Sequence, residues 1–183
     1  MKIAISGESG CGNTTVSKTV ARKLNLKPIN YTLRNLARDL KKPFSQIQKE
    51  VAKHPAWDVT VDKKQIQFAI KEKKCVLASR LATWTDDKRV LKKTGATSKP
   101  KYDLKVWLHA PLKTRAKRIA KREKKTLATA LRETRKRDAQ NRERYKNLYN
   151  LSITKHKHFF QVNTEKNTAL QVAQIIINKV KNP

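Results

Sequence analysis

Acidic residues are scarce in this chain of 183 residues. Only 14 Asp and Glu stand against 44 Lys and Arg, which gives a formal net charge of +30 and a pI near 10.5. Such an imbalance costs self-repulsion in the folded state and is tolerated most easily when a polyanion is bound. A lysine-biased surface on an ordinary protein is the alternative, but such a bias does not explain the shortage of acids. The composition therefore favours binding to nucleic acid.

Cysteines and long apolar runs are scarce as well. The two cysteines, Cys11 and Cys75, lie far apart in the sequence and are most simply reduced thiols, and the cysteines and histidines show no zinc spacing. No apolar run approaches the roughly 20 residues that span a bilayer. No leader of signal-peptide type precedes the first strand candidate, residues 1–6. We therefore expect a cytoplasmic protein that does not associate with membranes.

Strand and helix patterns alternate along the whole chain. Short apolar segments of strand type occur at residues 2–6, 75–79, 104–108 and 159–162, and helical periodicity marks the segments between them, including 112–123 and 127–149. This alternation implies an α/β fold with a parallel sheet that is covered on both faces.

One domain, residues 1–183, suits this length. Residues 31–73 and 122–150 are helical excursions from it. The polar stretch 85–103, with Gly95 and Pro100, reads as a basic loop.

A glycine-bearing loop follows the first strand directly and leads into a helix. Its sequence, Gly7-Glu-Ser-Gly-Cys-Gly-Asn-Thr-Thr15, has the context of a phosphate-binding P-loop. The backbone amides of such a loop converge on phosphate oxygens, and the helix N-terminus adds a favourable dipole. The candidate nucleotide-binding residues are Gly7, Gly10, Gly12, Asn13, Thr14 and Thr15, and Thr14 is the candidate magnesium ligand. The alternative is a tight turn that binds no ligand.

Beyond this loop the chain resembles the archaeal type of cytidylate kinase along nearly its whole length. The likeness lies in the order and spacing of several stretches, which are Ile5–Gly7 with Gly10–Val16, Leu33–Ala37, residues 54–65, Arg80–Trp84, Trp107–Leu112, Arg118–Glu123, Arg144–Lys146 with Tyr149, and Val162–Thr164. The resemblance implies a P-loop nucleoside monophosphate kinase fold with a five-stranded parallel sheet, helices on both faces and a helical lid. It also implies ATP and Mg²⁺ as cofactors and CMP or dCMP as the phosphate acceptor.

The resemblance assigns roles to individual side chains. Arg34 and Arg80 would contact the acceptor phosphate, and Asp58 and Asp62 would lie near the acceptor. The candidate catalytic arginines are Arg80, Arg118, Arg122 and Arg144, of which the last three belong to the lid. Phosphoryl transfer depends mostly on positioning and charge stabilisation, which suits arginines. Each arginine could instead be a solvated surface charge.

Three departures from the family pattern put kinase activity in question. Asn13 stands where a P-loop usually has lysine, and Ala78 and Ser79 replace an acidic residue and a glycine ahead of Arg80. The lost acid would help to organise magnesium and its waters. The turn at residues 28–32 is also shorter than in the family pattern.

These departures and the charge lead us to predict an RNA-binding protein on a kinase-like scaffold, with ribosomal RNA or a ribosomal particle as partner, whether or not nucleotide still binds. An active cytidylate kinase is the alternative. The candidate RNA-binding residues are Lys88, Arg89, Lys92, Lys93, Lys99, Lys101, Arg132, Arg135, Lys136, Arg137, Arg142 and Lys146. Those at 132–146 encircle a helix rather than form a stripe, which suggests phosphate contacts from more than one direction.

Overall fold

Five parallel strands form the centre of the molecule. The computed structural model describes residues 1–53, 56–154 and 159–182, so the first two residues of the stretch 54–65 lie outside it. The strands are β1 (Lys2–Gly7), β2 (Lys27–Ile29), β3 (Cys75–Ala78), β4 (Leu104–His109) and β5 (Phe160–Asn163), in the order β2-β3-β1-β4-β5. All four pairings between neighbouring strands are parallel, and β1 is paired on both sides. The predicted five-stranded parallel sheet is confirmed.

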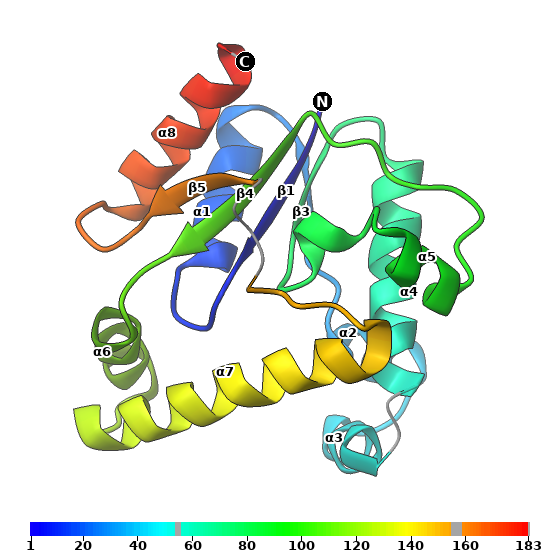
Figure 1. Cartoon of the computed structure of the whole chain (residues 1–183), viewed down its shortest axis with the longest axis horizontal. Helices are drawn as coiled ribbons and strands as arrows, with labels where there is room; N and C mark the ends of the chain where they lie inside the picture. The colour runs from blue at the N-terminus through cyan, green and yellow to red at the C-terminus, as the bar shows by residue number, and fades with distance from the viewer. Residues whose placement is uncertain (54–55, 155–158, 183) are drawn as a thin grey trace.

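Helices connect the strands and cover both faces of the sheet (Figure 1). The helices are α1 (Asn13–Lys23), α2 (Leu33–Asp39), α3 (Phe44–Lys53), α4 (Ala56–Lys71), the 3₁₀ turn η1 (Ala82–Trp84), α5 (Lys88–Thr94), α6 (Leu112–Glu123), α7 (Leu127–Tyr149) and α8 (Ala169–Lys181). The apolar residues of α1 and α8 recur at helical spacing and pack together on one face of the sheet. On the other face, α4, α5 and α7 contribute to a second cluster.

Apolar side chains from both faces make the core. Ile3 and Ile5 of β1 are fully buried against α1 and α8, and each such side chain contributes roughly 1.5–3 kcal/mol on burial. On the opposite face Trp84 packs edge-on against Trp107 and Phe159, with ring centroids 5.6 and 4.9 Å apart. The central strands are apolar on both faces, as a doubly covered parallel sheet requires.

Two elements differ from the sequence prediction. The stretch 85–103 is not a loop throughout, because α5 occupies Lys88–Thr94. Asp87 begins this helix by accepting a hydrogen bond from the Arg89 amide, the apolar Val90 anchors it in the core, and Gly95 ends it at φ 64°. The strand β2 was not predicted, because it is only three residues long, contains Pro28 and lies at the edge of the sheet.

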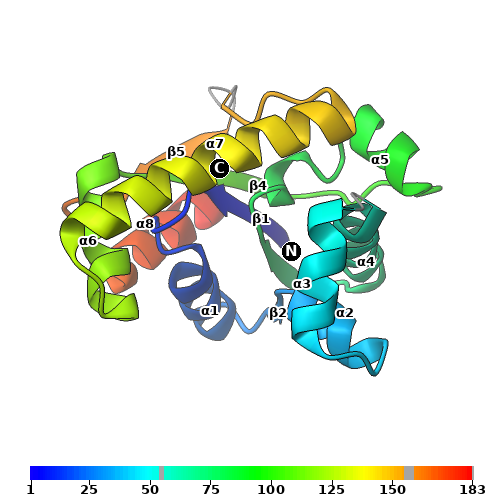
Figure 2. The same cartoon turned by 90° about the horizontal axis from the view of Figure 1, so that it is seen from below.

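The topology brings the functional loops to one end of the molecule. Because β1 and β3 are parallel neighbours, the segments that follow them meet at the same edge of the sheet, where α/β proteins bind ligands. The long helix α7 runs across this edge (Figure 1), with α6 on one side and α2, α3 and α4 on the other (Figure 2). No helix in the described ranges combines the length and apolar character that crossing a membrane requires.

Candidate functional site

A cleft of about 910 Å³ lies between the phosphate loop, α2, α4, the segment after β3, and the helices α6 and α7. It is lined by the predicted nucleotide-binding residues Gly7, Gly10, Gly12, Asn13, Thr14 and Thr15. It is also lined by the predicted acceptor and lid residues Arg34, Asp58, Asp62, Arg80, Arg118, Arg122 and Arg144. The structure therefore brings together side chains that are up to about 140 positions apart in the sequence.

The phosphate loop depends on glycine where the chain passes close to its neighbours. A Cβ atom on Gly7 would lie 2.5 Å from the Leu108 carbonyl oxygen, and one on Gly10 would lie 2.8 Å from the Arg115 carbonyl oxygen. Gly10 and Gly12 also have φ values of 87° and 93°, which residues other than glycine rarely adopt. The loop ends at Gly12, where α1 begins and presents its N-terminus to the cleft.

Asn13 connects the two ends of the phosphate loop. Its Nδ2 atom donates a hydrogen bond of 2.9 Å to the Gly7 carbonyl oxygen, which ties the end of the loop to its beginning. Its Oδ1 atom is buried and has no hydrogen-bond partner within the described residues. Asn13 brings no positive charge, so the charge that a phosphate requires must come from elsewhere in the cleft.

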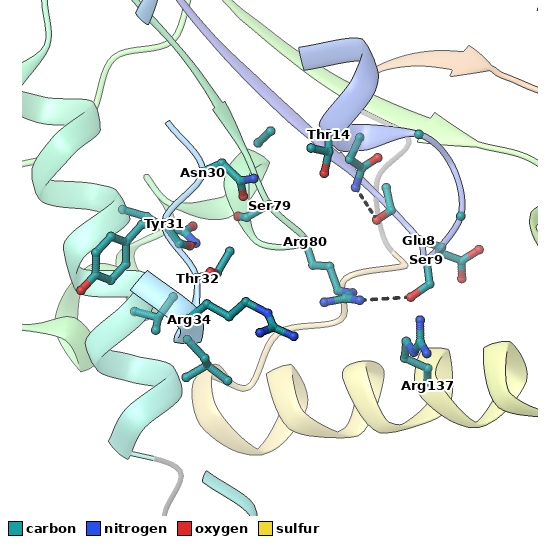
Figure 3. A pocket seen from close by; sticks show the side chains of 18 of the residues that line it. Glu8, Ser9, Thr14, Asn30, Tyr31, Thr32, Arg34, Ser79, Arg80 and Arg137 are labelled. Carbon is teal, nitrogen blue, oxygen red and sulfur yellow. Dashed lines mark hydrogen bonds between the residues drawn. The ribbon is translucent and has the colours of Figure 1, made fainter. Parts of the chain in front are cut away.

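Arginines supply that charge from several elements (Figure 3). Arg34 on α2 and Arg80 after β3 extend into the cleft, and Arg137 on α7 points toward Ser9 of the phosphate loop. Arg80 donates a hydrogen bond of 3.1 Å to the Ser9 hydroxyl, while its own Nε is buried without a partner among the described residues. The guanidinium of Arg34 lies 4.1 Å from the centre of the Phe44 ring. The cleft thus offers charged donors with free hydrogen-bonding capacity.

The lid arginines differ in how firmly they are held. Arg118 donates to the Thr164 carbonyl and, at 3.0 Å, to the Thr164 hydroxyl, and its Nη1 lies 3.4 Å from the Gly10 carbonyl oxygen. Arg122 pairs with Glu123 at 2.6 Å on the surface. Arg144 lies 3.3 Å from Asp58. Arg118 is therefore fixed beside the phosphate loop, whereas Arg122 and Arg144 hold exposed or half-exposed pairs that a phosphate could replace.

Two acids, Asp58 and Asp62, line the cleft from α4. Burial raises the pKa of Asp58, and the opposing charge of Arg144 limits the rise. Asp62 is almost fully buried, and this burial raises its pKa to about 7, although the Tyr149 hydroxyl donates to it at 2.7 Å. One turn along α4, Gln65 donates to the Tyr31 carbonyl at 2.8 Å, which fixes the turn at residues 28–32 to α4.

The side chains that could bind a magnesium ion in the cleft offer neutral oxygen atoms. Thr14 stands exposed at the end of the phosphate loop, and the buried Ser79 hydroxyl has no hydrogen-bond partner within the described residues. Asn30 follows β2 and Ser79 follows its parallel neighbour β3, and both line the cleft (Figure 3). Across the described ranges, no cluster of three or more His, Cys, Asp or Glu could hold a metal. These residues fit a magnesium ion that keeps waters and arrives with nucleotide phosphates, because such an ion needs few protein ligands.

The family comparison agrees with this geometry. The model of the cytidylate kinase-like family matches residues 2–164. The chain belongs to the cytidylate kinase-like family. Cytidylate kinase 2 of Borrelia garinii subsp. bavariensis is 40% identical to it over 156 residues, which cover 84% of this chain and 80% of that protein. The cytidylate kinase of Methanocaldococcus jannaschii is 35% identical over 155 residues, which cover 84% and 82%.

Solved structures show the same fold at lower identity. The deoxyadenosine kinase from M. mycoides with bound dATP has a TM-score of 0.63 and 21% identity, with 99% of this chain and all of that chain covered. Shikimate kinase from Bacteroides thetaiotaomicron has a TM-score of 0.62 and 16% identity, with 100% and 99% covered. The α/β fold of P-loop nucleoside monophosphate kinases is confirmed. The resemblance to archaeal enzymes is confirmed in part, since Borrelia proteins of this cytidylate kinase-like family match as well.

The prediction of an RNA-binding function is wrong. The relatives that span most of the chain are cytidylate kinases, and the comparisons give no support to RNA or a ribosomal particle as partner. The charge around α7 misled the prediction: Arg137 and Arg144 line the cleft, and Arg142 lies 3.5 Å from Glu8. Arg89 is likewise occupied, by Asp87 and the Asn150 carbonyl. The remaining candidates are exposed surface charges, namely Lys88, Lys92, Lys93, Lys99, Lys101, Arg132, Arg135, Lys136 and Lys146.

Sequence reasoning missed several residues of the site. The sequence predicts Arg137 as an RNA-binding residue and indicates no role for Ser9, Tyr31 and Gln65, although all four line the cleft. Arg137 could have been found from helix geometry, because it lies seven residues before Arg144, which is two turns along the same face. The other three give no comparable signal, because their roles depend on contacts between distant segments.

Proposed function

We propose that this protein is a cytidylate kinase that transfers the terminal phosphoryl group of ATP to CMP or dCMP. The observation that carries the proposal is a single cleft in which a phosphate loop and six arginines from four segments face one another. Membership of the cytidylate kinase-like family supports the choice of acceptor.

The residues divide between donor and acceptor. The amides of the phosphate loop and Arg118 would hold the ATP phosphates, since Arg118 is fixed beside Gly10. Arg34 would hold the acceptor phosphate, and Arg80 stands between the two halves because it contacts Ser9 from the strand next to β1. Phosphoryl transfer requires charge stabilisation at this midpoint, where both phosphates carry negative charge.

The net charge of the cleft fits anionic substrates. Its three acids, counted among the described lining residues, are Glu8, Asp58 and Asp62. Glu8 and Asp58 are paired with arginines, and burial favours the protonated form of Asp62. The described lining residues therefore carry excess positive charge, which two nucleotides would balance. Magnesium, when bound with ATP, would neutralise phosphate charge, and Thr14 would contribute one ligand.

A coupled assay of ADP formation with ATP, Mg²⁺ and CMP tests the proposal. We expect turnover with CMP and dCMP and at least tenfold less with AMP. Because Ala78 takes the place of an acid at the end of β3, Ala78→Glu should raise kcat. The absence of acceptor-dependent ADP formation by a folded protein would contradict the proposal.

A further inference from the structure

We propose that Arg115 is a positioning residue that holds the tip of the phosphate loop, Glu8–Gly10, against α7. This inference rests on the proposed function, because it assigns the loop to ATP. Arg115 is on α6, its side chain is only 6% exposed, and it is not among the residues that line the cleft. It can therefore act on ATP only through the loop.

Four contacts fix the Arg115 guanidinium. Nε donates to the Ala110 carbonyl at 3.0 Å, and Nη1 donates to the Ser9 carbonyl at 3.0 Å. Nη1 also lies 2.6 Å from an Asp138 carboxylate oxygen, and Nη2 lies 2.9 Å from a Glu8 carboxylate oxygen. One buried planar group thus joins the phosphate loop, the end of β4 and α7, which only a guanidinium with its fork of donors can do.

The loop is also seated on the backbone of Arg115. The space that a Cβ atom of Gly10 would need is filled by the Arg115 carbonyl oxygen, 2.8 Å away. The loop tip therefore rests directly on the first turns of α6, and the side chain of the same residue then holds Glu8 and Ser9. Backbone contact and side-chain contact fix the tip in one orientation.

This orientation fixes Ser9 on the side of the cleft that is assigned to ATP. Ser9 is held from two sides, because Arg115 takes its carbonyl and Arg80 donates to its hydroxyl at 3.1 Å. Because Arg115 holds the Ser9 carbonyl oxygen on its own side, the backbone amides of the loop are free to point toward phosphate oxygens. Arg137 precedes Asp138 on α7, so the Arg115–Asp138 pair also fixes the turn from which Arg137 points toward Ser9 (Figure 3).

Replacement of either partner should disturb this arrangement strongly. Asp138 is 5% exposed, so loss of its cation leaves a buried charge without compensation. Arg115→Lys keeps the positive charge but cannot contact Ser9, Glu8 and Asp138 in one plane. Asp138→Asn keeps the shape of the side chain and its oxygen but removes the charge.

Calorimetric titration with ATP and steady-state kinetics test the inference. For Arg115→Lys and Asp138→Asn we expect the Kd and KM for ATP to rise on the order of tenfold or more, because a small misplacement of binding groups costs this much. The KM for CMP should stay within about twofold. Arg132→Lys, an exposed substitution on α7, is the matched control and should change neither constant.

A change in the KM for ATP without a change in the KM for CMP distinguishes a positioning role of Arg115 from a merely structural one. A variant that loses only thermal stability, or that changes the KM for ATP and CMP equally, would overturn the inference, and Asp138→Asn decides the matter if Arg115→Lys does not fold. ATP binding without acceptor keeps the test separate from the proposed function. If the native protein binds ATP but does not phosphorylate CMP, the effect on Kd still decides the role of Arg115. Absence of ATP binding by the native protein would overturn both.

Discussion

Arg80 is the residue on which the two halves of the cleft converge. It leaves the end of β3, contacts Ser9 of the phosphate loop and keeps a buried Nε that no described group satisfies. A buried donor without a partner is costly, so a phosphate oxygen at this place would gain a charge-assisted hydrogen bond. Lysine could supply the charge, but its donors all lie on one nitrogen, so it could not serve Ser9 and a phosphate from two separate nitrogens as Nη2 and Nε of Arg80 can.

We therefore predict that Arg80→Lys lowers kcat/KM for CMP phosphorylation by roughly ten- to a hundredfold, which corresponds to the loss of one hydrogen bond to a charged group. Steady-state assays with CMP measure this effect. Arg135→Lys, at an exposed position of α7, provides the control and should leave kcat/KM unchanged. Equal activity of the two variants would show that Arg80 is not at the reacting centre.

Asp62 gives the cleft a carboxyl group that titrates near neutral pH. Its pKa is about 7 in the folded protein and 3.8 in the absence of the fold. Between these values the folded state binds a proton that the unfolded chain does not, so the free energy of unfolding falls as pH rises. The slope from this group is at most about 1.4 kcal/mol per pH unit.

Asp62→Asn removes the ionisable group and with it this loss of stability at higher pH. The asparagine keeps an oxygen that can accept the hydrogen bond from the Tyr149 hydroxyl. We predict that the variant gains stability relative to the native protein as pH increases from 5 to 8. Denaturant unfolding at the two pH values measures the difference. A difference that is equal at both values would mean that Asp62 is ionised throughout, and the assignment of its raised pKa would fail.

Helix α7 shows how a correctly predicted element can carry a wrong function. Its limits follow from the sequence, because Thr126 caps it and Asn150 ends it in the left-handed conformation. Its buried face, however, is largely polar and includes Thr134, Asp138 and Asn141. Hydrophobic periodicity cannot identify such a face, so the sequence alone does not separate the charges that face the protein from those that face solvent. The basic residues of α7 differ in what they face: some face an acid, some face the cleft and the rest face solvent. Tertiary contacts decide which of these applies to each residue.

The phosphate loop is the contrasting element. Its glycines, its place between β1 and α1 and the position of Thr14 could all be read from the sequence, because they depend on local backbone conformation. Its anchorage by Arg115 could not, since Arg115 is about a hundred residues away and resembles its many basic neighbours. Local chemistry thus predicts a phosphate-binding loop, and the three-dimensional contacts show which side chains hold that loop in place.

Helix α6 ends at a residue whose backbone conformation would suit glycine better than the lysine that is present. Lys124 follows the helix with φ 52° and ψ 47°, a left-handed conformation that costs a residue with a side chain about 1 kcal/mol. We predict that Lys124→Gly stabilises the protein by about 0.5–1 kcal/mol. Lys121→Gly, in the last turn of the same helix, should instead destabilise it by a similar amount. Thermal unfolding of both variants checks the prediction, which fails if glycine has the same effect at both positions.

The whole molecule carries far more positive charge than its cleft requires. A net charge of +30 destabilises a folded domain by self-repulsion, and salt screens exposed charges over about 10 Å at 0.1 M. The charge is therefore expected to appear as a stability that depends on ionic strength, independently of any ligand. The lysines at positions 92, 93, 99 and 101 are exposed and do not line the cleft, so replacing them tests the effect of net charge on stability without changing the site.

We predict that the Tm rises by at least about 2 °C between 20 and 300 mM sodium chloride, because each kcal/mol gained shifts the Tm of a domain of this size by about 2–4 °C. Replacement of these four lysines by glutamine lowers the net charge to +26, so the variant should have a higher Tm at low salt and a smaller response to salt. Sodium chloride is preferable to sulfate, since an anion that binds the cleft would stabilise by mass action. Scanning calorimetry measures both proteins. A Tm that does not change with chloride would mean that the ion pairs and spacing of the surface already offset the repulsion, and the excess charge would then have no cost to the fold.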